Sequence, residues 1–128
     1  MEWSVLVTLM ALAQFVWFGI RVGQARAKGD VQAPAMTGTE LFDRRNRVHG
    51  NTLEQLVVFI PSLWAFSAYV HPLIGAGLGV VFLIGRFMYA TAYEKDPQSR
   101  GAGFGVTFLP VAILLLGGVG GAIWRLVQ

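Results

Sequence analysis

The segment that most restricts the fold is residues 44–69, which passes from polar to apolar with no turn signal between the two halves. Its polar half contains Arg47, Asn51 and Glu54 at i, i+4 and i+7, so a helix places all three on one face. Such a face just inside a membrane boundary is costly unless it contacts protein or a polar ligand. The segment therefore predicts a helix that enters a membrane and carries a polar face at the point of entry.

Two interpretations of this polar face remain open at this point. In the first, the face forms half of a binding site for a small zwitterionic molecule. In the second, residues 44–54 form an amphipathic helix beside the membrane, and their charges lie among the lipid headgroups. Both fit the segment by itself, so the choice depends on polar residues elsewhere in the chain.

The composition indicates that the bilayer is the main solvent of this chain. Hydrophobic residues make up 55% of the 128 residues and charged residues 13%, whereas a soluble domain has about 45–50% and about 25%. A spanning helix needs about 20 mostly apolar residues, so the length allows four spans with short connections and no separate soluble domain. We therefore expect an all-α integral membrane protein in which residues 1–128 form a single domain, a four-transmembrane-helix bundle.

Capping and turn residues delimit the four expected helices. Thr39 is suited to cap the second helix, and Pro72 is suited to open the third. Asp96 followed by Pro97 resembles an N-cap and the first residue of the fourth helix, which would place Arg100 in its first turn. The expected spans are residues 3–20 or a little beyond, a second helix that ends near residue 70, residues 73–93, and a fourth helix from residues 96–97 to about residue 124.

Four further expectations concern the interior, the connections and helix packing. Gln14 is the one strongly polar residue inside the first span and is expected to face other helices. Residues 29–38 are expected to form a loop, and residues 94–96 the connection between the third and fourth helices. A small-residue surface for close packing is expected on the third helix at Gly75, Gly77, Gly79 and Gly85.

The basic residues are distributed unevenly between the two ends of the expected bundle. Only Arg125 lies at the end that carries the two termini. By the positive-inside rule, the first and third connections are cytoplasmic and both termini are outside, so the polar face of residues 44–54 lies near the cytoplasmic face. The nine basic residues at the other end are Arg21, Arg26, Lys28, Arg44, Arg45, Arg47, Arg86, Lys95 and Arg100.

Several function classes are disfavoured by the sequence. The chain has no cysteine, no P-loop and no dinucleotide-binding glycine pattern. His49 and His71 lie on different sides of the bilayer in the expected topology, so no metal site is predicted. The basic residues lie at span ends, where the positive-inside rule explains them without nucleic acid. An ion-coupled multidrug carrier of similar size would require an acidic side chain in its first span, and residues 5–20 contain none.

The polar residues near the cytoplasmic side form one candidate site. An interfacial aromatic belt accounts for the tyrosines but not for Arg86, which lies two turns inside the end of the third helix. Arginine pairs with carboxylates in a bidentate fork, and Glu54 is suited to receive an amine. The implied ligand is a small molecule with more than one carboxylate and an amino group. The candidate residues are Arg47, Asn51, Glu54, Arg86, Tyr89, Tyr93 and Arg100.

These residues resemble the signature of a known family. The run Arg47-Val-His-Gly-Asn51-Thr-Leu-Glu54, followed by Gly85-Arg86-Phe-Met-Tyr89 and then Tyr93 and Arg100, is similar to the MAPEG superfamily, the membrane-associated proteins of eicosanoid and glutathione metabolism. The resemblance is closest to the branch with the microsomal glutathione transferases and leukotriene C synthase. It covers nearly the whole chain.

The resemblance implies an assembly and a set of contacts. It implies a homotrimer of four-helix subunits with glutathione, as co-substrate, bound between neighbours near the cytoplasmic face. Arg100 would stabilise the glutathione thiolate, and the other candidate residues would hold the ligand. Arg26 and His49 match two further contact positions, although the family often has Gln at the position of His49. The sequence also departs from the family pattern at Gln55 and at Val57, with Pro61 one turn later.

Three hypotheses of function follow. The first is a membrane-bound glutathione transferase, with or without peroxidase activity, that acts on lipophilic electrophiles from the bilayer, as in detoxification. The second is a non-catalytic lipid-binding protein similar to the lipoxygenase-activating branch. The third is a small transporter. The combination of Arg100 with Tyr89 and Tyr93 favours the first hypothesis over the second.

The first prediction concerns topology. A reporter fused after Gln128 should behave as external, because nine of the ten basic residues lie at the end remote from the termini. Accessibility of the reporter to impermeant reagents in intact cells measures this directly. A cytoplasmic signal would reverse the topology and put the candidate site on the other side of the membrane.

Overall fold

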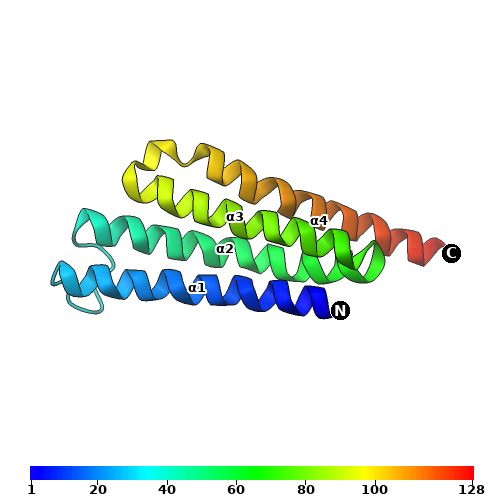
Figure 1. Cartoon of the computed structure of the whole chain (residues 1–128), viewed down its shortest axis with the longest axis horizontal. Coiled ribbons are helices and arrows are strands. Elements are labelled where there is room, and N and C mark those ends of the chain that lie inside the picture. The colour runs from blue at the N-terminus through cyan, green and yellow to red at the C-terminus, as the bar shows by residue number, and fades with distance from the viewer.

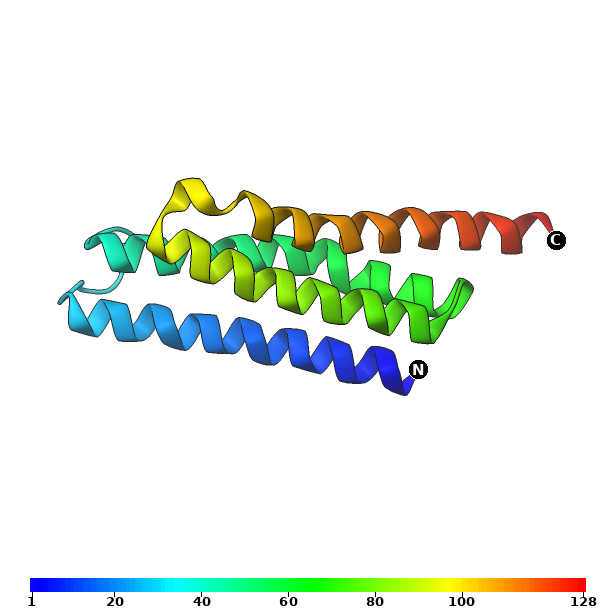
Figure 2. The ribbon, with the colours of Figure 1, turned by 45° about the horizontal axis from the view of Figure 1, so that its top comes forward.

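Four long helices run alternately up and down in the computed structural model, which describes all residues 1–128 (Figure 1). They are α1 (Glu2–Lys28), α2 (Glu40–Tyr69), α3 (Pro72–Lys95) and α4 (Gly101–Val127), with a short 3-10 helix η1 (Pro97–Ser99) before α4. The α1–α2 and α3–α4 connections lie at one end, and the two termini and the α2–α3 turn lie at the other (Figures 1 and 2). The expectation of an all-helical chain with four long helices is confirmed.

Most expected helix starts are confirmed by the capping contacts. The Thr39 hydroxyl accepts a hydrogen bond from the Phe42 backbone N–H at 3.2 Å, so it caps α2. The His71 Nδ1 atom accepts from the backbone N–H of Leu73 at 3.2 Å, and Pro72 is the first residue of α3. The short His71-Pro72 connection therefore reverses the chain directly.

The expected start of the fourth helix is wrong by one turn. The Asp96 carboxylate caps η1 by accepting from the Gln98 N–H at 3.1 Å, and α4 begins only at Gly101. Arg100 is thus the N-cap residue of α4 and not a member of its first turn. The other two corrections are smaller: α1 extends to Lys28, and α3 includes Glu94 and Lys95, which were expected in the connection.

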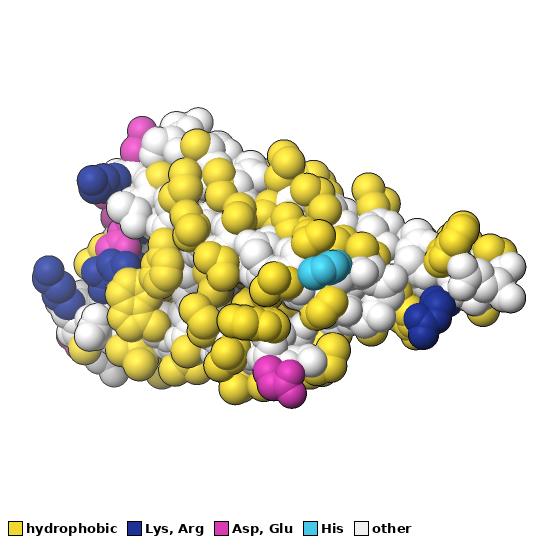
Figure 3. Space-filling view, turned by 45° about the vertical axis from the view of Figure 1, so that its right-hand side comes forward, with side chains coloured by type: hydrophobic (Ala, Val, Ile, Leu, Met, Phe, Trp, Pro, Cys, Tyr) yellow, Lys and Arg dark blue, Asp and Glu magenta, His cyan; other side chains and the backbone are white.

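Three helices, α1, α3 and α4, are long and apolar enough to cross a membrane. The α2 helix is not apolar enough to be counted with them, because its first half carries the polar residues of the segment 44–54. Hydrophobic side chains cover the flank of the bundle in Figure 3, and most Lys and Arg side chains gather at the end with the two long connections. A flank of this kind needs an apolar environment, since soluble monomers expose only small contiguous apolar patches.

All four helices contribute to the core. Phe59 of α2 and Phe82 of α3 stack with ring centroids 3.9 Å apart, and both are fully buried together with Ala11 of α1 and Leu114 of α4. Gln14 is also buried and donates a hydrogen bond from Nε2 to the Leu83 carbonyl at 3.0 Å. This confirms the expectation that Gln14 faces other helices.

Glycine allows α3 and α4 to approach each other closely near the connection end. A Cβ atom at Gly85 would lie 2.6 Å from the Thr107 backbone nitrogen, and a Cβ atom at Gly103 would lie 2.6 Å from the Tyr89 Cα. Both are closer than any real Cβ contact, and the obstructing atoms are backbone. These two contacts therefore fix the start of α4 against the last turns of α3. Gly77, by contrast, meets nothing within 4 Å.

The second prediction tests this close approach. Gly85→Ala should lower the free energy of unfolding by about 1–3 kcal/mol, because the added methyl group would have to push α4 away from α3. The matched control is Gly77→Ala in the same helix, which meets open space and should be neutral or slightly stabilising. Thermal unfolding in detergent measures both, and equal stability of the two variants would contradict the proposed contact.

Candidate functional site

A polar hollow of about 310 Å³, here called the tyrosine hollow, lies between α2, α3 and the start of α4. It brings together six of the nine residues predicted to bind or activate a ligand, from three separate parts of the chain. Its lining consists of Arg47, Asn51, Glu54, Tyr89, Tyr93, Arg100 and Phe104. The i, i+4, i+7 face predicted for α2 therefore lies opposite Tyr89 and Tyr93 of α3.

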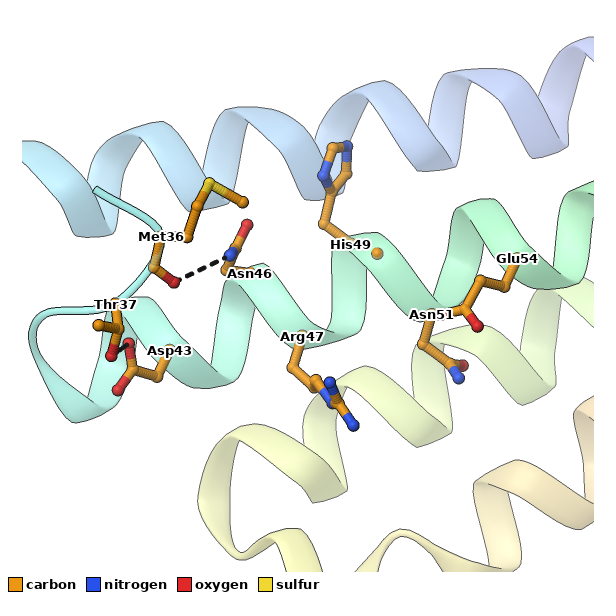
Figure 4. A pocket seen from close by; sticks show the side chains of 9 residues that line it. Met36, Thr37, Asp43, Asn46, Arg47, His49, Asn51 and Glu54 are labelled. Carbon is orange, nitrogen blue, oxygen red and sulfur yellow. Dashed lines mark hydrogen bonds between the residues drawn. The ribbon is translucent and has the colours of Figure 1, made fainter. Parts of the chain in front are cut away.

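The α2 side of the tyrosine hollow carries groups that lack partners within the chain. Arg47 and Glu54 are exposed, and neither forms an ion pair. The Asn51 Oδ1 atom is buried and accepts no hydrogen bond. Figure 4 shows Arg47 and Asn51 extending from the same side of α2. A cation, an anion and an amide oxygen are therefore available here to a ligand.

The α3 side is built from two stacked tyrosines. The rings of Tyr89 and Tyr93 lie with centroids 5.6 Å apart at an interplanar angle of 23°. Only 4% of Tyr89 is exposed, and Tyr93 is partly exposed. The phenolic hydroxyls make no hydrogen bond to the rest of the chain, so both are free to donate to a ligand.

Arg86 lies beneath this stack and does not line the tyrosine hollow. It is fully buried, and its guanidinium carbon lies 4.5 Å from the centroid of the Tyr89 ring. Its Nη2 donates to the Thr52 hydroxyl at 2.8 Å, and Thr52 in turn donates to the Val48 carbonyl at 2.7 Å. Arg86 Nε and Nη1 have no partner. In this position Arg86 supports Tyr89 from below.

Arg100 lies at the rim of the tyrosine hollow where α4 begins. Its Nη1 donates to the Pro97 carbonyl at 2.6 Å, which leaves its other donors free. The first backbone N–H groups of a helix have no partner within the helix and carry partial positive charge. The guanidinium and the start of α4 thus both favour an anion at this rim.

A second polar hollow, the loop hollow, has a volume of about 470 Å³ and lies on α2 next to the α1–α2 connection. His49 lines it but points toward α1, on the opposite side of α2 from Arg47 (Figure 4). The imidazole stacks on Phe15 with centroids 4.3 Å apart. The other lining residues are Met36, Thr37, Asp43, Asn46, Arg47, Gly50, Asn51 and Glu54.

Arg26 lines neither hollow. Its Nη1 donates to the Ala35 carbonyl at 2.9 Å, and its guanidinium lies 4.6 Å from the centroid of the Phe42 ring. These contacts hold the α1–α2 connection against the two helices. Within one chain, Arg26, His49 and Arg86 therefore do not line the tyrosine hollow, although His49 lines the loop hollow together with Arg47, Asn51 and Glu54.

An apolar groove of about 400 Å³ adjoins the tyrosine hollow and runs between α2 and α4. Glu54 and Phe104 line both, and the Phe104 and Phe108 rings stack at 5.9 Å along the groove. Phe104 was not among the predicted site residues, although it follows Arg100 by four residues, the spacing that places two side chains on one helix face. The remaining lining is Gln55, Val58, Val111, Ala112, Leu115 and Leu116.

These features define a class of protein: an all-helical bundle with helices able to cross a membrane, a polar hollow at one end and an apolar groove beside it. Comparison with known sequences assigns the chain to a family, which the fold and the hollows alone do not. Residues 4–120 match the MAPEG family, and the chain belongs to that family.

Individual relatives agree with this assignment. An uncharacterised protein of Synechocystis is 44% identical over 98% of this chain and 92% of its own length. Human microsomal glutathione S-transferase 2 is 34% identical over 89% of this chain and 78% of its own length. The mouse protein of the same name is 35% identical over 85% of this chain and 78% of its own length. The resemblance found from the sequence motifs is thus confirmed.

The third prediction concerns the support beneath the tyrosines. Thr52→Val should lower the free energy of unfolding by about 1–3 kcal/mol, because it removes the only hydrogen-bond acceptor of the buried Arg86 guanidinium. Thr107→Val is the control, since Thr107 is equally buried and bonds only to the Gly103 carbonyl one turn earlier. Unfolding in detergent compares the two, and an equal loss would contradict a special role for the Thr52–Arg86 contact.

Proposed function

We propose that this protein is a membrane-bound glutathione transferase that conjugates the glutathione thiolate to lipophilic electrophiles from the bilayer. The observation that carries the proposal is the convergence of six polar side chains from α2, α3 and the start of α4 on one hollow. The names of the human and mouse relatives support it.

The side chains of the tyrosine hollow match the groups of glutathione. Glutathione has two carboxylates, one amino group, two peptide groups and a thiol. In the proposal, Arg47 binds a carboxylate and Glu54 receives the amino group, while Asn51 contacts a peptide group. The Tyr89 and Tyr93 hydroxyls donate to the remaining acceptors. Arg86 acts through Tyr89, because it is buried below the ring and is not exposed to the hollow.

Arg100 is assigned to the thiol. A free thiol has a pKa of about 8.5, so only about 3% is thiolate at pH 7. Lowering the pKa by about two units takes about 2.7 kcal/mol of preference for the anion. A charge-assisted hydrogen bond supplies about 1.5–3 kcal/mol and a helix N-terminus about 0.3–1 kcal/mol. Arg100 at the N-cap of α4 offers both.

The reaction needs the electrophile next to the sulfur. The thiol proton leaves to solvent, the thiolate forms a carbon–sulfur bond, and the leaving group departs with its electron pair. The apolar groove along Phe104 and Phe108 meets the tyrosine hollow at Glu54 and Phe104, so an apolar molecule in the groove would face the bound thiolate. Electrophiles that partition into the bilayer would reach the groove from the side.

We also propose that the functional unit is a homotrimer in which all four helices span the membrane. The loop hollow shares Arg47, Asn51 and Glu54 with the tyrosine hollow and continues the polar face of α2 toward His49 and the α1–α2 connection. A neighbouring subunit against this face would complete a glutathione site between subunits and would bring a second set of Arg26 and His49 near it. Native mass spectrometry in detergent tests the assembly, and a monomer that still binds glutathione would contradict a shared site.

The fourth prediction tests the role of Arg100. If Arg100 lowers the thiol pKa by about two units, Arg100→Leu should reduce the thiolate fraction at pH 7 from about three quarters to about 3%. Turnover with a generic aryl halide at saturating glutathione should then fall about 25-fold, and the thiolate ultraviolet absorbance of the bound ligand should disappear. Arg100→Lys should restore only part, since an ammonium keeps the charge but lacks the planar fork.

The matched control is Lys95→Leu, which removes a positive charge from the same end of the molecule outside both hollows. It should leave turnover unchanged. If Arg100→Leu keeps both the thiolate absorbance and turnover, another cation activates the thiol. If the unmodified protein forms no thiolate and no conjugate, the non-catalytic lipid-binding hypothesis replaces the transferase.

A further inference from the structure

The Glu94 carboxylate, in the last turn of α3, joins three helices at the connection end. Arg21 of α1 donates from Nη2 to both carboxylate oxygens, at 2.8 and 2.7 Å. Arg45 of α2 donates from Nε to one of them at 2.9 Å. We call this group of three side chains the Glu94 clamp. Its members come from parts of the chain up to 73 residues apart.

Backbone contacts extend the Glu94 clamp. Arg45 Nη1 also donates to the Arg21 carbonyl at 3.1 Å, which ties α2 to α1 a second time. Arg44 Nη1 donates to the carbonyls of Glu94 and Lys95 at 3.0 and 2.9 Å. These carbonyls belong to the last turn of α3, where the helix offers them no partner. Two consecutive arginines of α2 therefore hold both the side chain and the end of α3.

The Glu94 clamp is sheltered from solvent. The side chains of Arg21, Arg45 and Glu94 are 23%, 18% and 19% exposed. Solvent screens such pairs less than it screens fully exposed ones, and the loss of one partner leaves charges that are poorly hydrated. The contrast is Glu40, which pairs with Arg44 within α2 but is 75% exposed.

The position of the Glu94 clamp connects it to the tyrosine hollow. Tyr93 directly precedes Glu94, and Arg47 follows Arg45 by two residues on α2, so the clamp ties α2 to α3 at the level of the hollow. Its three side chains face α1 and do not line the hollow. Arg21 and Arg45 share the single Glu94 carboxylate as their ion-pair partner. Arg47 and Arg100 are then the cations of the hollow that remain unpaired for the carboxylates and the thiolate of a ligand.

We infer that Glu94 is a positioning residue for glutathione: by fastening α2 to α3, it fixes the distance between Arg47 on α2 and Tyr93 on α3. This inference rests on the proposed function. Residues that hold the peptide part of a substrate equally in the ground and transition states affect the Michaelis constant more than turnover. A positioning role for Glu94 therefore has a kinetic signature that a general loss of stability lacks.

Glu94→Gln removes the charge from both ion pairs and keeps the size of the side chain. We expect the KM for glutathione to rise about fivefold to tenfold, equivalent to about 1–1.4 kcal/mol. The kcat at saturating glutathione and the KM for the aryl halide should each change less than twofold. The matched control is Glu40→Gln, which removes an exposed pair within one helix at the same end and should change neither constant.

Two conservative variants keep the test informative if Glu94→Gln does not fold. Glu94→Asp retains the charge on a shorter side chain, and Arg45→Lys retains the charge but loses the guanidinium fork. Both should give intermediate increases in the KM for glutathione.

The outcomes separate this inference from the proposed function. If the unmodified protein neither binds nor conjugates glutathione, the proposed function fails and the inference fails with it. If the unmodified protein conjugates glutathione but Glu94→Gln, or both conservative variants, have an unchanged KM in the folded fraction, the inference alone is overturned. A fall in kcat at unchanged KM would also overturn it, because it would put Glu94 in the chemical step.

Discussion

The polar side chains in the first half of α2 need hydrogen-bond and ion-pair partners at the end of a bundle whose flanks are apolar. Most of the contacts at that end supply such partners. Four polar positions of this half contact α3 directly or across the tyrosine hollow. Arg44 and Arg45 hold the end of α3, Thr52 accepts from Arg86, and Arg47 lies opposite the stacked tyrosines. Without these contacts a helix with so many charges would favour water over the bundle.

The arginines of this end divide into two groups by their contacts. Arg21, Arg44 and Arg45 are bonded to Glu94 or to the end of α3, and Arg86 is buried against Thr52 and Tyr89. Arg47 and Arg100 line the tyrosine hollow without an ion-pair partner. Arg26 holds the α1–α2 connection through Ala35 and Phe42, so the same residue type stabilises packing at five positions and remains available to a ligand at two. The glycine contacts of α3 with α4 complete the arrangement, because they bring Arg100 to the rim.

Helix existence and most helix starts could be predicted from the sequence because they depend on local chemistry. Thr39 and Pro72 act within a few residues of themselves, so their roles are visible in the chain order. The role of Asp96-Pro97 was misinterpreted because this pair can open either a 3-10 helix or an α-helix, and here it opens η1. The start of α4 depends instead on the close contact between Gly103 and the α3 backbone, which is not visible in the local sequence.

Site residues could be predicted from the sequence where helical spacing alone determines the direction in which their side chains point. Arg47, Asn51 and Glu54 share a face by spacing, and they line one hollow. His49 follows Arg47 by two residues, and this spacing points the two side chains apart, a signal that the motif resemblance obscured. The Glu94 clamp had no local signal, since Arg21 and Glu94 are 73 residues apart and the positive-inside rule already explained the arginines.

The central claim is that the tyrosine hollow binds glutathione and stabilises its thiolate. The most direct measurement is a pH titration of the thiolate absorbance of glutathione bound to the unmodified protein in detergent. The account predicts an apparent pKa for the bound thiol about two units below the free value of about 8.5. A bound thiol that titrates at the free value would contradict the account.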